Sequence, residues 1–308
     1  MKNLFTNRIS TLYQTEANRT SFESVLTTLD KRLSSLQPFS LVRLGDGESQ
    51  LLCKKYQCKK EDWNFQYDLW FGDSQPNLRQ ISDLRHRLKN SIRDADLLGI
   101  PELHKLRQHR RWLLTYSTLL EQKLLRKQII ADTNTHWYLQ FSGWYINVLD
   151  TNRTVWIITC RDLEQVLRKH FPGTKFQQFL ICGESMHPGK TKTPHWPNGF
   201  EDCIQFLSKI RKGDILLVGA GGLGKIYANL GRSKGAFSLD IGSVFDGWNG
   251  INSRNYSKME SSIFSLEWLL QLRHISNEKR ISEVEKITSN WPVKDGCFLR
   301  KTPGKYVD

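Results

Sequence analysis

The stretch LVRLGDGE places two carboxylates, Asp46 and Glu48, directly after an apolar run, with a glycine before each. Alternate carboxylates at a strand end can hold Mg²⁺ or Mn²⁺, since these ions prefer oxygen ligands and complete their shells with phosphate oxygens. Arg43 lies on the preceding run, where its guanidinium can contact the same anion. Gly45 and Gly47 permit a tight backbone turn and leave room for a bulky ligand. A plain acidic turn is the alternative interpretation, because Gly-Asp-Gly is common in turns.

A second glycine-rich stretch, DILLVGAGGLGKIYANLG, has the spacing of a dinucleotide-binding loop. Gly219, Gly221 and Gly224 lie between a strand-like and a helical run, and Asp240 follows about 20 residues after the first of them. The pattern predicts contact with NAD(P) or with the diphosphate of a sugar nucleotide at a helix N-terminus, where Asp240 would bind a ribose hydroxyl. Close helix–strand packing is the third interpretation. The late position of the motif weighs against NAD(P), because only one further strand follows it.

Two other polar stretches follow strand-like runs. LDIGSVFDGWNG carries Asp240 and Asp246 on either side of a small-residue turn, and Trp248 is placed to stack on a sugar or a base. Helix capping by an acid is the alternative interpretation of that stretch. The loop CGESMHPGKTKTPHWPNG begins with Glu184, which is a candidate base or acceptor contact. Loops of this length are often lids or substrate loops.

The elements that must position these residues alternate along the chain, and they predict an α/β fold. We expect it to be Rossmann-like, with a mainly parallel sheet and helices on both faces. Ligands of such sheets bind beyond the carboxyl ends of the strands, where the polar loops above would lie. Thr20 and Glu23 have the spacing of a capping box. Predicted helices cover residues 20–36, 103–130, 199–211 and 222–232, and predicted strands are FSLVRL, DADLLGIP, TVWIITCR, FQQFLICGES, GDILLVGAGG and AFSLDIGS.

Composition narrows the class of partner. Among 308 residues, 45 Lys and Arg against 31 Asp and Glu give a net charge of +14, which favours anionic partners. The basic cluster RQHRRW is either a solvated helix face or a surface that contacts phosphate or membrane. We find no Walker A loop, serine-hydrolase elbow, zinc spacing or nucleic-acid-binding signature, so no nucleic acid is expected.

The six cysteines include no Cys-x-x-Cys pair, which indicates reduced and mostly buried thiols. No signal peptide and no apolar run of the ~20 residues that a spanning helix needs are found. We therefore expect a cytoplasmic protein, with peripheral contact at the inner face of an anionic membrane as a further expectation. The segment after about residue 276 is expected to form a helix and an extended end.

Three separated stretches, in this order, resemble the bacterial glycosyltransferases of the GT-D fold: FSLVRLGDGE, WYLQFSGWYINVLD and LLVGAGGLGKIYANLGRSKGAFSLDIGSVFDGWNG. With no internal repeat and no long linker, we expect one domain over residues 1–308. The resemblance covers a core at about 20–255 and leaves a C-terminal extension at about 256–308. It also implies transfer of a sugar from a nucleotide-sugar donor to a glycan or lipid-linked acceptor, in the synthesis of surface polysaccharides or glycoprotein glycans.

The family's Asp-x-Glu motif falls on Asp46 and Glu48, which implies a site for Mn²⁺ or Mg²⁺ beside the donor diphosphate. Where better-known members continue the Asp-Ile-Gly segment with His and acidic residues, this chain has Ser-Val-Phe-Asp. Asp240, Asp246 and Glu184 therefore stay unranked as candidates for the catalytic base. The expected nucleotide-sugar contacts are Arg43, Gly45, Gly47, Gly219, Gly221, Gly222, Lys225 and Asp240.

Overall fold

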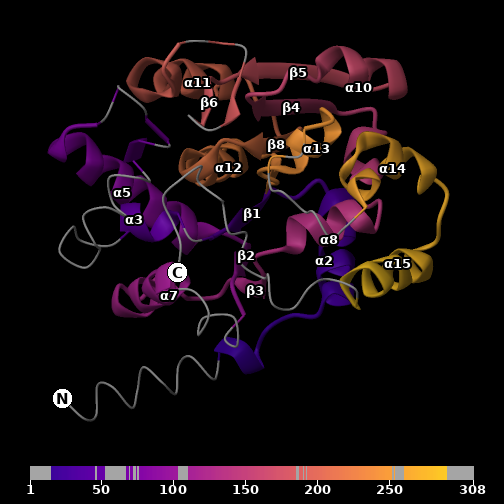
Figure 1. Ribbon diagram of the computed structural model, residues 1–308, viewed down its shortest axis with the longest axis horizontal. Helices are drawn as coiled ribbons and strands as arrows, with labels where there is room; N and C mark the ends of the chain where they lie inside the picture. Colours follow the sequence, from indigo (N-terminus) through magenta and orange to yellow (C-terminus); the bar gives the residue numbers. More distant parts are fainter. Residues whose placement is uncertain are drawn as a thin grey trace.

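The fold is built on a seven-stranded sheet in the order β3-β2-β1-β9-β8-β4-β5, and every neighbouring pair is parallel (Figure 1). The computed structural model describes residues 15–45, 47–52, 67–68, 70–71, 74, 76–102, 110–184, 187–189, 191, 193–251, 253 and 260–289. The strands are β1 (Phe39–Arg43), β2 (Leu97–Ile100), β3 (Ile129–Asp132), β4 (Thr154–Thr159), β5 (Lys175–Leu180), β8 (Ile215–Gly219) and β9 (Phe237–Asp240), with a separate antiparallel pair β6 (Gly183–Glu184) and β7 (His187–Pro188).

The strand order creates a crevice at the centre of the sheet. The chain runs outward from β1 through β2 to β3 at one edge, continues with β4 and β5 at the other edge, and returns through β8 and β9. Leu52, in the connection after β1, packs on one face of the sheet, whereas Val244, in the connection after β9, packs on the other. The connections from these two paired strands therefore leave in different directions. In open α/β sheets such a point is where ligands bind, at the carboxyl ends of the strands.

Both faces of the sheet are covered by helices, and this explains why its strands are almost continuously apolar. Successive side chains of a strand point to opposite faces, so Leu217 and Val218 of β8 enter different hydrophobic clusters. One face is covered by α3 (Glu48–Leu52), α5 (Leu78–Asp94), α7 (Arg110–Glu121), α11 (Phe200–Leu207) and α12 (Gly224–Ser233). The other is covered by α2 (Phe22–Ser34), α8 (Thr135–Phe141), α9 (Ile146–Leu149), α10 (Glu164–His170), α13 (Val244–Trp248), α14 (Leu266–Gln271) and α15 (Asn277–Ser289).

The α/β class and the two covered faces confirm the sequence prediction, but one strand of the main sheet was missed. Residues 103–130 were expected to be largely helical, whereas the described part is helical only in α7 and contains the start of edge strand β3. Residues 103–109 lie outside the described part. Pairing with β2 determines that 129–132 are a strand, through partners such as Leu98 and Ile130. A run of four residues carries too little periodicity to show this.

Two smaller predictions also need correction. The helix α2 is capped by Ser21, whose hydroxyl accepts from Ser24 N. Thr20 was predicted as the cap, but its N–H donates to Ile130 O beside the sheet. Of the described cysteines, Cys203 is buried, but Cys160 and Cys182 are only half-buried, so "mostly buried" was wrong for them. The helix expected after residue 276 is α15.

Within the described ranges, no helix combines the length and the apolar character that crossing a bilayer requires.

Candidate active site

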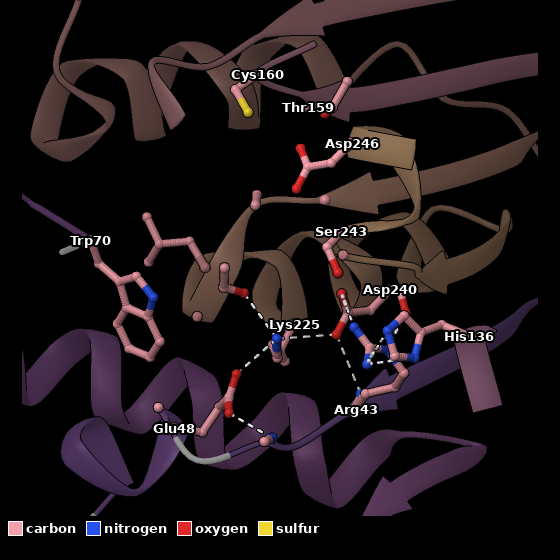
Figure 2. Close-up of a pocket in the computed structure, with 18 of the residues that line it drawn as sticks. Arg43, Glu48, Trp70, His136, Thr159, Cys160, Lys225, Asp240, Ser243 and Asp246 are labelled. Atoms are coloured by element: carbon pink, nitrogen blue, oxygen red, sulfur yellow. Dashed lines mark hydrogen bonds and ion pairs between the residues drawn. The ribbon is translucent and has the colours of Figure 1, made fainter. Parts of the chain in front are cut away.

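A cavity of about 190 Å³ opens at the carboxyl ends of β1, β4, β8 and β9 (Figure 2). It is lined from both halves of the sheet, so it occupies the crevice that the strand order predicts. All eight residues expected to contact the nucleotide sugar line it, as do Glu48 of the predicted metal-binding pair and the candidate base Asp246. These lining residues are Arg43, Gly45, Gly47, Glu48, Gly219, Gly221, Gly222, Lys225, Asp240 and Asp246.

Lys225 lies at the centre of the charged side chains. Its Nζ is 2.8 Å from Glu48 Oε1 and 3.1 Å from Asp240 Oδ2, and it donates to Gly221 O at 2.9 Å. Burial by itself lowers the pKa of Lys225, but the Asp240 and Glu48 carboxylates more than compensate and raise it above its ordinary value. The ammonium therefore stays charged although only 5% of the residue is exposed.

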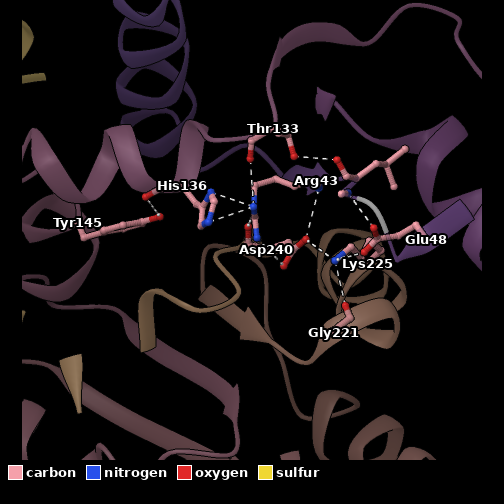
Figure 3. Close-up of polar contacts among 10 residues, drawn as sticks. Arg43, Glu48, Thr133, His136, Tyr145, Gly221, Lys225 and Asp240 are labelled. Carbon is pink, nitrogen blue, oxygen red and sulfur yellow. Dashed lines mark hydrogen bonds and ion pairs between the residues drawn. The ribbon is translucent and has the colours of Figure 1, made fainter. Parts of the chain in front are cut away.

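Arg43, the last residue of β1, is held by protein oxygens and a histidine. Its Nε donates to Asp240 O at 2.9 Å and its Nη1 to Thr133 O at 3.0 Å, while Nη1 also lies 2.8 Å from His136 Nδ1 (Figure 3). Nη2 lies 3.9 Å from Asp240 Oδ1. It also lies 2.5 Å from the position that a Cβ on Gly242 would take. Nη2 is thus the part of the guanidinium left to bind an anion in the cavity.

The loop after β1 is shaped by polar contacts. Gly45 N donates to Glu48 Oε2 at 2.7 Å, so the carboxylate caps its own loop. Thr133 Oγ1 donates to Leu44 O at 2.7 Å, and Thr115 Oγ1 donates to Gly45 O at 3.3 Å. Asp46, the other half of the predicted metal-binding pair, lies outside the described residues. Its role stays a prediction.

The loop after β8 is shaped by close packing. A Cβ on Gly219 would lie 2.6 Å from the Phe245 ring and 2.7 Å from Gly242 O, and one on Gly222 would lie 2.6 Å from the Trp70 ring. Gly221 has φ +53°, a conformation that favours glycine. A 3₁₀ turn at Gly221–Leu223 then leads into α12. The packing interpretation of this motif therefore holds for Gly219 and Gly222, and both of them line the cavity together with Gly221.

Arg161 and Asp246 form an ion pair, and Asp246 lies across the cavity from Lys225 (Figure 2). Arg161 Nε lies 2.7 Å from Asp246 Oδ1, with 6% and 15% of the two side chains exposed. Ser253 Oγ also donates to Asp246 Oδ2. Asp246 is therefore more accessible than Asp240, of whose side chain 1% is exposed.

Two candidates are not brought into the described cavity wall. Glu184 lies on β6, but its side chain is outside the described part, so its role stays a prediction. Trp248 was expected to stack on a ligand, and that expectation was wrong. The residue is 4% exposed, its Nε1 donates to Gln140 Oε1 at 2.8 Å, and its ring packs on Tyr145 and Phe245 in the core.

The structure adds residues that sequence reasoning missed. Thr133 and His136 follow β3, so recognising that short strand would have exposed them by the strand-end rule. Arg161 follows β4, which was predicted, and the same rule applies to it. Trp70 and Trp112 line the cavity without any local signal, whereas His195, which also lines it, lies in the polar loop singled out from the sequence. Burial lowers the pKa of His195 to about 4, and its Nε2 lies 2.7 Å from Tyr227 Oη, which indicates a neutral ring.

The chemistry of this lining suits a hard cation only in part. Glu48 presents carboxylate oxygens to the cavity, and each oxygen accepts one protein hydrogen bond, which leaves lone pairs for a cation. Among the described residues, no group of three or more His, Cys, Asp or Glu is arranged to hold a metal. A metal would therefore need further ligands, from Asp46 and from a bound phosphate.

The charges of the described lining cancel. Three side chains are cationic and three are anionic, with the neutral His195 beside them. A diphosphate would therefore enter a site without surplus positive charge, where a divalent cation would offset the charge of the phosphates. The six charged residues are Arg43, Arg161, Lys225, Glu48, Asp240 and Asp246.

Residues 20–248 match the GT-D fold-like domain family, a span that includes every charged residue of the described cavity wall. The chain belongs to the GT-D-like family. This membership supports a glycosyltransferase. No curated protein matches the chain. Two solved structures of a domain of unknown function 1792, one described as having a distinct glycosyltransferase fold and the other selenomethionine-substituted, are 12% and 13% identical. Each covers 89% of this GT-D-like chain and 97% of its own, with a TM-score of 0.48.

Proposed function

We propose that this GT-D-like protein is a metal-dependent glycosyltransferase that moves a sugar from a nucleotide-sugar donor to a glycan or lipid-linked acceptor. The observation that carries the proposal is the charged cavity at the switch point of the sheet, within the part of the chain that matches the family. The donor diphosphate lies beside the loops after β1 and β8, near Arg43 Nη2 and the Gly221–Gly222 backbone. Asp46 and Glu48 would hold Mn²⁺ or Mg²⁺, which would neutralise the charge of the diphosphate.

In the reaction, an acceptor hydroxyl attacks the anomeric carbon of the donor sugar. The bond from that carbon to the diphosphate oxygen breaks, and the nucleoside diphosphate leaves with the electron pair. The acceptor proton passes to a base. Of the two described candidates, Asp246 is favoured, because Asp240 is nearly inaccessible and lies between Lys225 and Arg43.

A second cavity supports a separate place for the acceptor. It has a volume of about 240 Å³ and shares Trp137 and Ser243 with the first. Its described lining carries hydroxyl, aromatic and backbone groups and no charged side chain, which suits a neutral sugar. Ser253, which lines it, contacts the Asp246 carboxylate of the first cavity. A lipid-linked acceptor would bring this basic protein to an anionic membrane surface.

The environment of Asp240 weighs against a dinucleotide-dependent oxidoreductase. In that alternative its carboxylate must bind ribose hydroxyls. Here Oδ2 contacts Lys225 and accepts from Arg43 N at 3.4 Å, and 1% of the side chain is exposed.

Calorimetric titration tests the proposal. UDP and GDP are titrated with and without Mn²⁺, and NAD⁺ and NADH are titrated without metal. We expect tight binding of one nucleoside diphosphate only with Mn²⁺, and loss of this binding in Asp46→Ala and Glu48→Ala variants that remain folded. Binding of NAD⁺ or NADH alone would establish the alternative, and nucleotide binding that survives both substitutions would remove the metal assignment.

A further inference from the structure

The Lys225 ammonium has no hydrogen left for a ligand. An ammonium group donates three hydrogen bonds, and three protein oxygens lie around Nζ: Glu48 Oε1 at 2.8 Å, Gly221 O at 2.9 Å and Asp240 Oδ2 at 3.1 Å (Figure 3). Direct binding of a phosphate by Lys225 would require one of these contacts to break. The obvious sequence-based role, a lysine on the diphosphate, is therefore not the one that the geometry favours.

The three oxygens come from three loops on both sides of the crevice. Glu48 begins α3 after β1, Gly221 lies in the loop after β8, and Asp240 ends β9. Lys225 itself is in the first turn of α12, which packs against all three of these strands. One side chain thus joins the carboxylate loop of the first half of the sheet to the glycine-rich loop of the second.

Burial makes this connection rigid. Glu48 and Lys225 are each 5% exposed and Asp240 is 1% exposed. The second oxygen of Glu48, Oε2, accepts from Gly45 N at 2.7 Å, so the carboxylate is fixed at both oxygens. Loss of Lys225 would leave two buried carboxylates facing each other without the cation between them, and like charges at short range repel strongly.

We infer that Lys225 is a positioning residue that holds the Glu48 carboxylate in place for the metal-bound donor and does not itself bind the diphosphate. The identity of the ligand in this inference rests on the proposed function. The connection between the two loops rests on the contacts of Lys225 described above. The contact that reaches the donor directly is assigned to Arg43 Nη2. Loss of Lys225 therefore acts on donor binding only through Glu48.

A double-mutant cycle on nucleotide binding tests the inference. UDP and GDP are titrated with and without Mn²⁺ into the full chain carrying Lys225→Met, Glu48→Gln or both. Lys234→Met, at the exposed C-cap of the same helix, is the control. We expect Lys225→Met to weaken Mn²⁺-dependent binding at least tenfold, to leave metal-free binding within twofold of wild type, and to add no loss to Glu48→Gln. An equal loss with and without metal, or losses that multiply, would show that Lys225 contacts the diphosphate.

A second cycle keeps the inference testable if the wild-type protein binds neither nucleotide, a result that would defeat the proposed function alone. The same variants are unfolded in urea. We expect Lys225→Met and Glu48→Gln each to lower the urea midpoint. The midpoint of the double variant should fall by much less than the sum of the two single shifts. Strictly additive shifts would overturn the connection. If Lys225→Met does not fold, it is replaced in both cycles by a variant that carries Lys225→Met together with Asp240→Asn. The second substitution removes one unpaired charge.

Discussion

The loops after β1 and β8 face each other across the cavity, and both are rich in glycine, yet they are built differently. The β1 loop is held by hydrogen bonds, and a Cβ on Gly45 would meet only Glu48 Oε2 at 3.5 Å, an ordinary contact. The β8 loop is held by packing, with Gly219 pressed against Phe245 and the backbone of Gly242. The loop that looks like a dinucleotide-binding motif thus needs its first glycine for the fold. The loop with the carboxylates depends instead on its polar groups, whose hydrogen bonds fix its conformation.

The largest expected effect is on the packed side. Gly219→Ala puts a Cβ 2.6 Å from the Phe245 ring and 2.7 Å from Gly242 O, and backbone cannot move away cheaply. We expect a loss of about 3 kcal/mol in the free energy of unfolding, measured in urea. Gly173→Ala is the control, because nothing lies within 4 Å of its added Cβ. Equal stability of the two variants would contradict the packing account.

Low pH should also destabilise the side of the cavity that carries the β8 loop. The residue responsible is His195, which contacts Tyr227 of α12. Burial lowers its folded pKa from 6.5 to about 4, so only the unfolded chain takes up a proton between these values, and stability falls as the pH drops through that window. Between pH 6.5 and 5 we expect the wild type to lose about 2 kcal/mol more than His195→Gln. Urea titrations at both pH values measure this, and parallel losses would exclude His195 as the source.

A smaller effect is expected for Gly222→Ala. Its Cβ would lie 2.6 Å from ring carbons at the far end of the Trp70 side chain, which can rotate away where backbone cannot. We expect about 1 kcal/mol of destabilisation, together with a change in tryptophan fluorescence as Trp70 moves. A loss as large as that of Gly219→Ala would mean that Trp70 is as fixed as the backbone.

The smallest effect is expected in the β1 loop. Gly45→Ala adds a Cβ at an ordinary contact distance and at a backbone conformation open to any residue, so stability should change by less than about 0.5 kcal/mol. The urea midpoint checks this. A loss above 1 kcal/mol would show that both loops depend on glycine for their packing, and the contrast between them would disappear.

The sequence was sufficient for the α/β class, six of the seven strands of the main sheet and the cavity edge on which the polar residues meet. Alternating runs, strand ends and glycine spacing are local properties, and they carry this information. The missed strand β3 is four residues long, and its pairing with β2 is a contact between distant parts of the chain. Thr133 and His136, which hold Arg43, were missed for the same reason.

By itself the sequence determined which residue types lie at the carboxyl ends of the strands, because a strand and the polar residues that follow it are consecutive in the chain. Only the tertiary structure decided how these residues are used. It placed Lys225 between Glu48 and Asp240, paired Asp246 with Arg161, and moved Trp248 into the core. These outcomes depend on strand order and on the space between packed elements, and residues up to about 200 positions apart meet only once the sheet has formed.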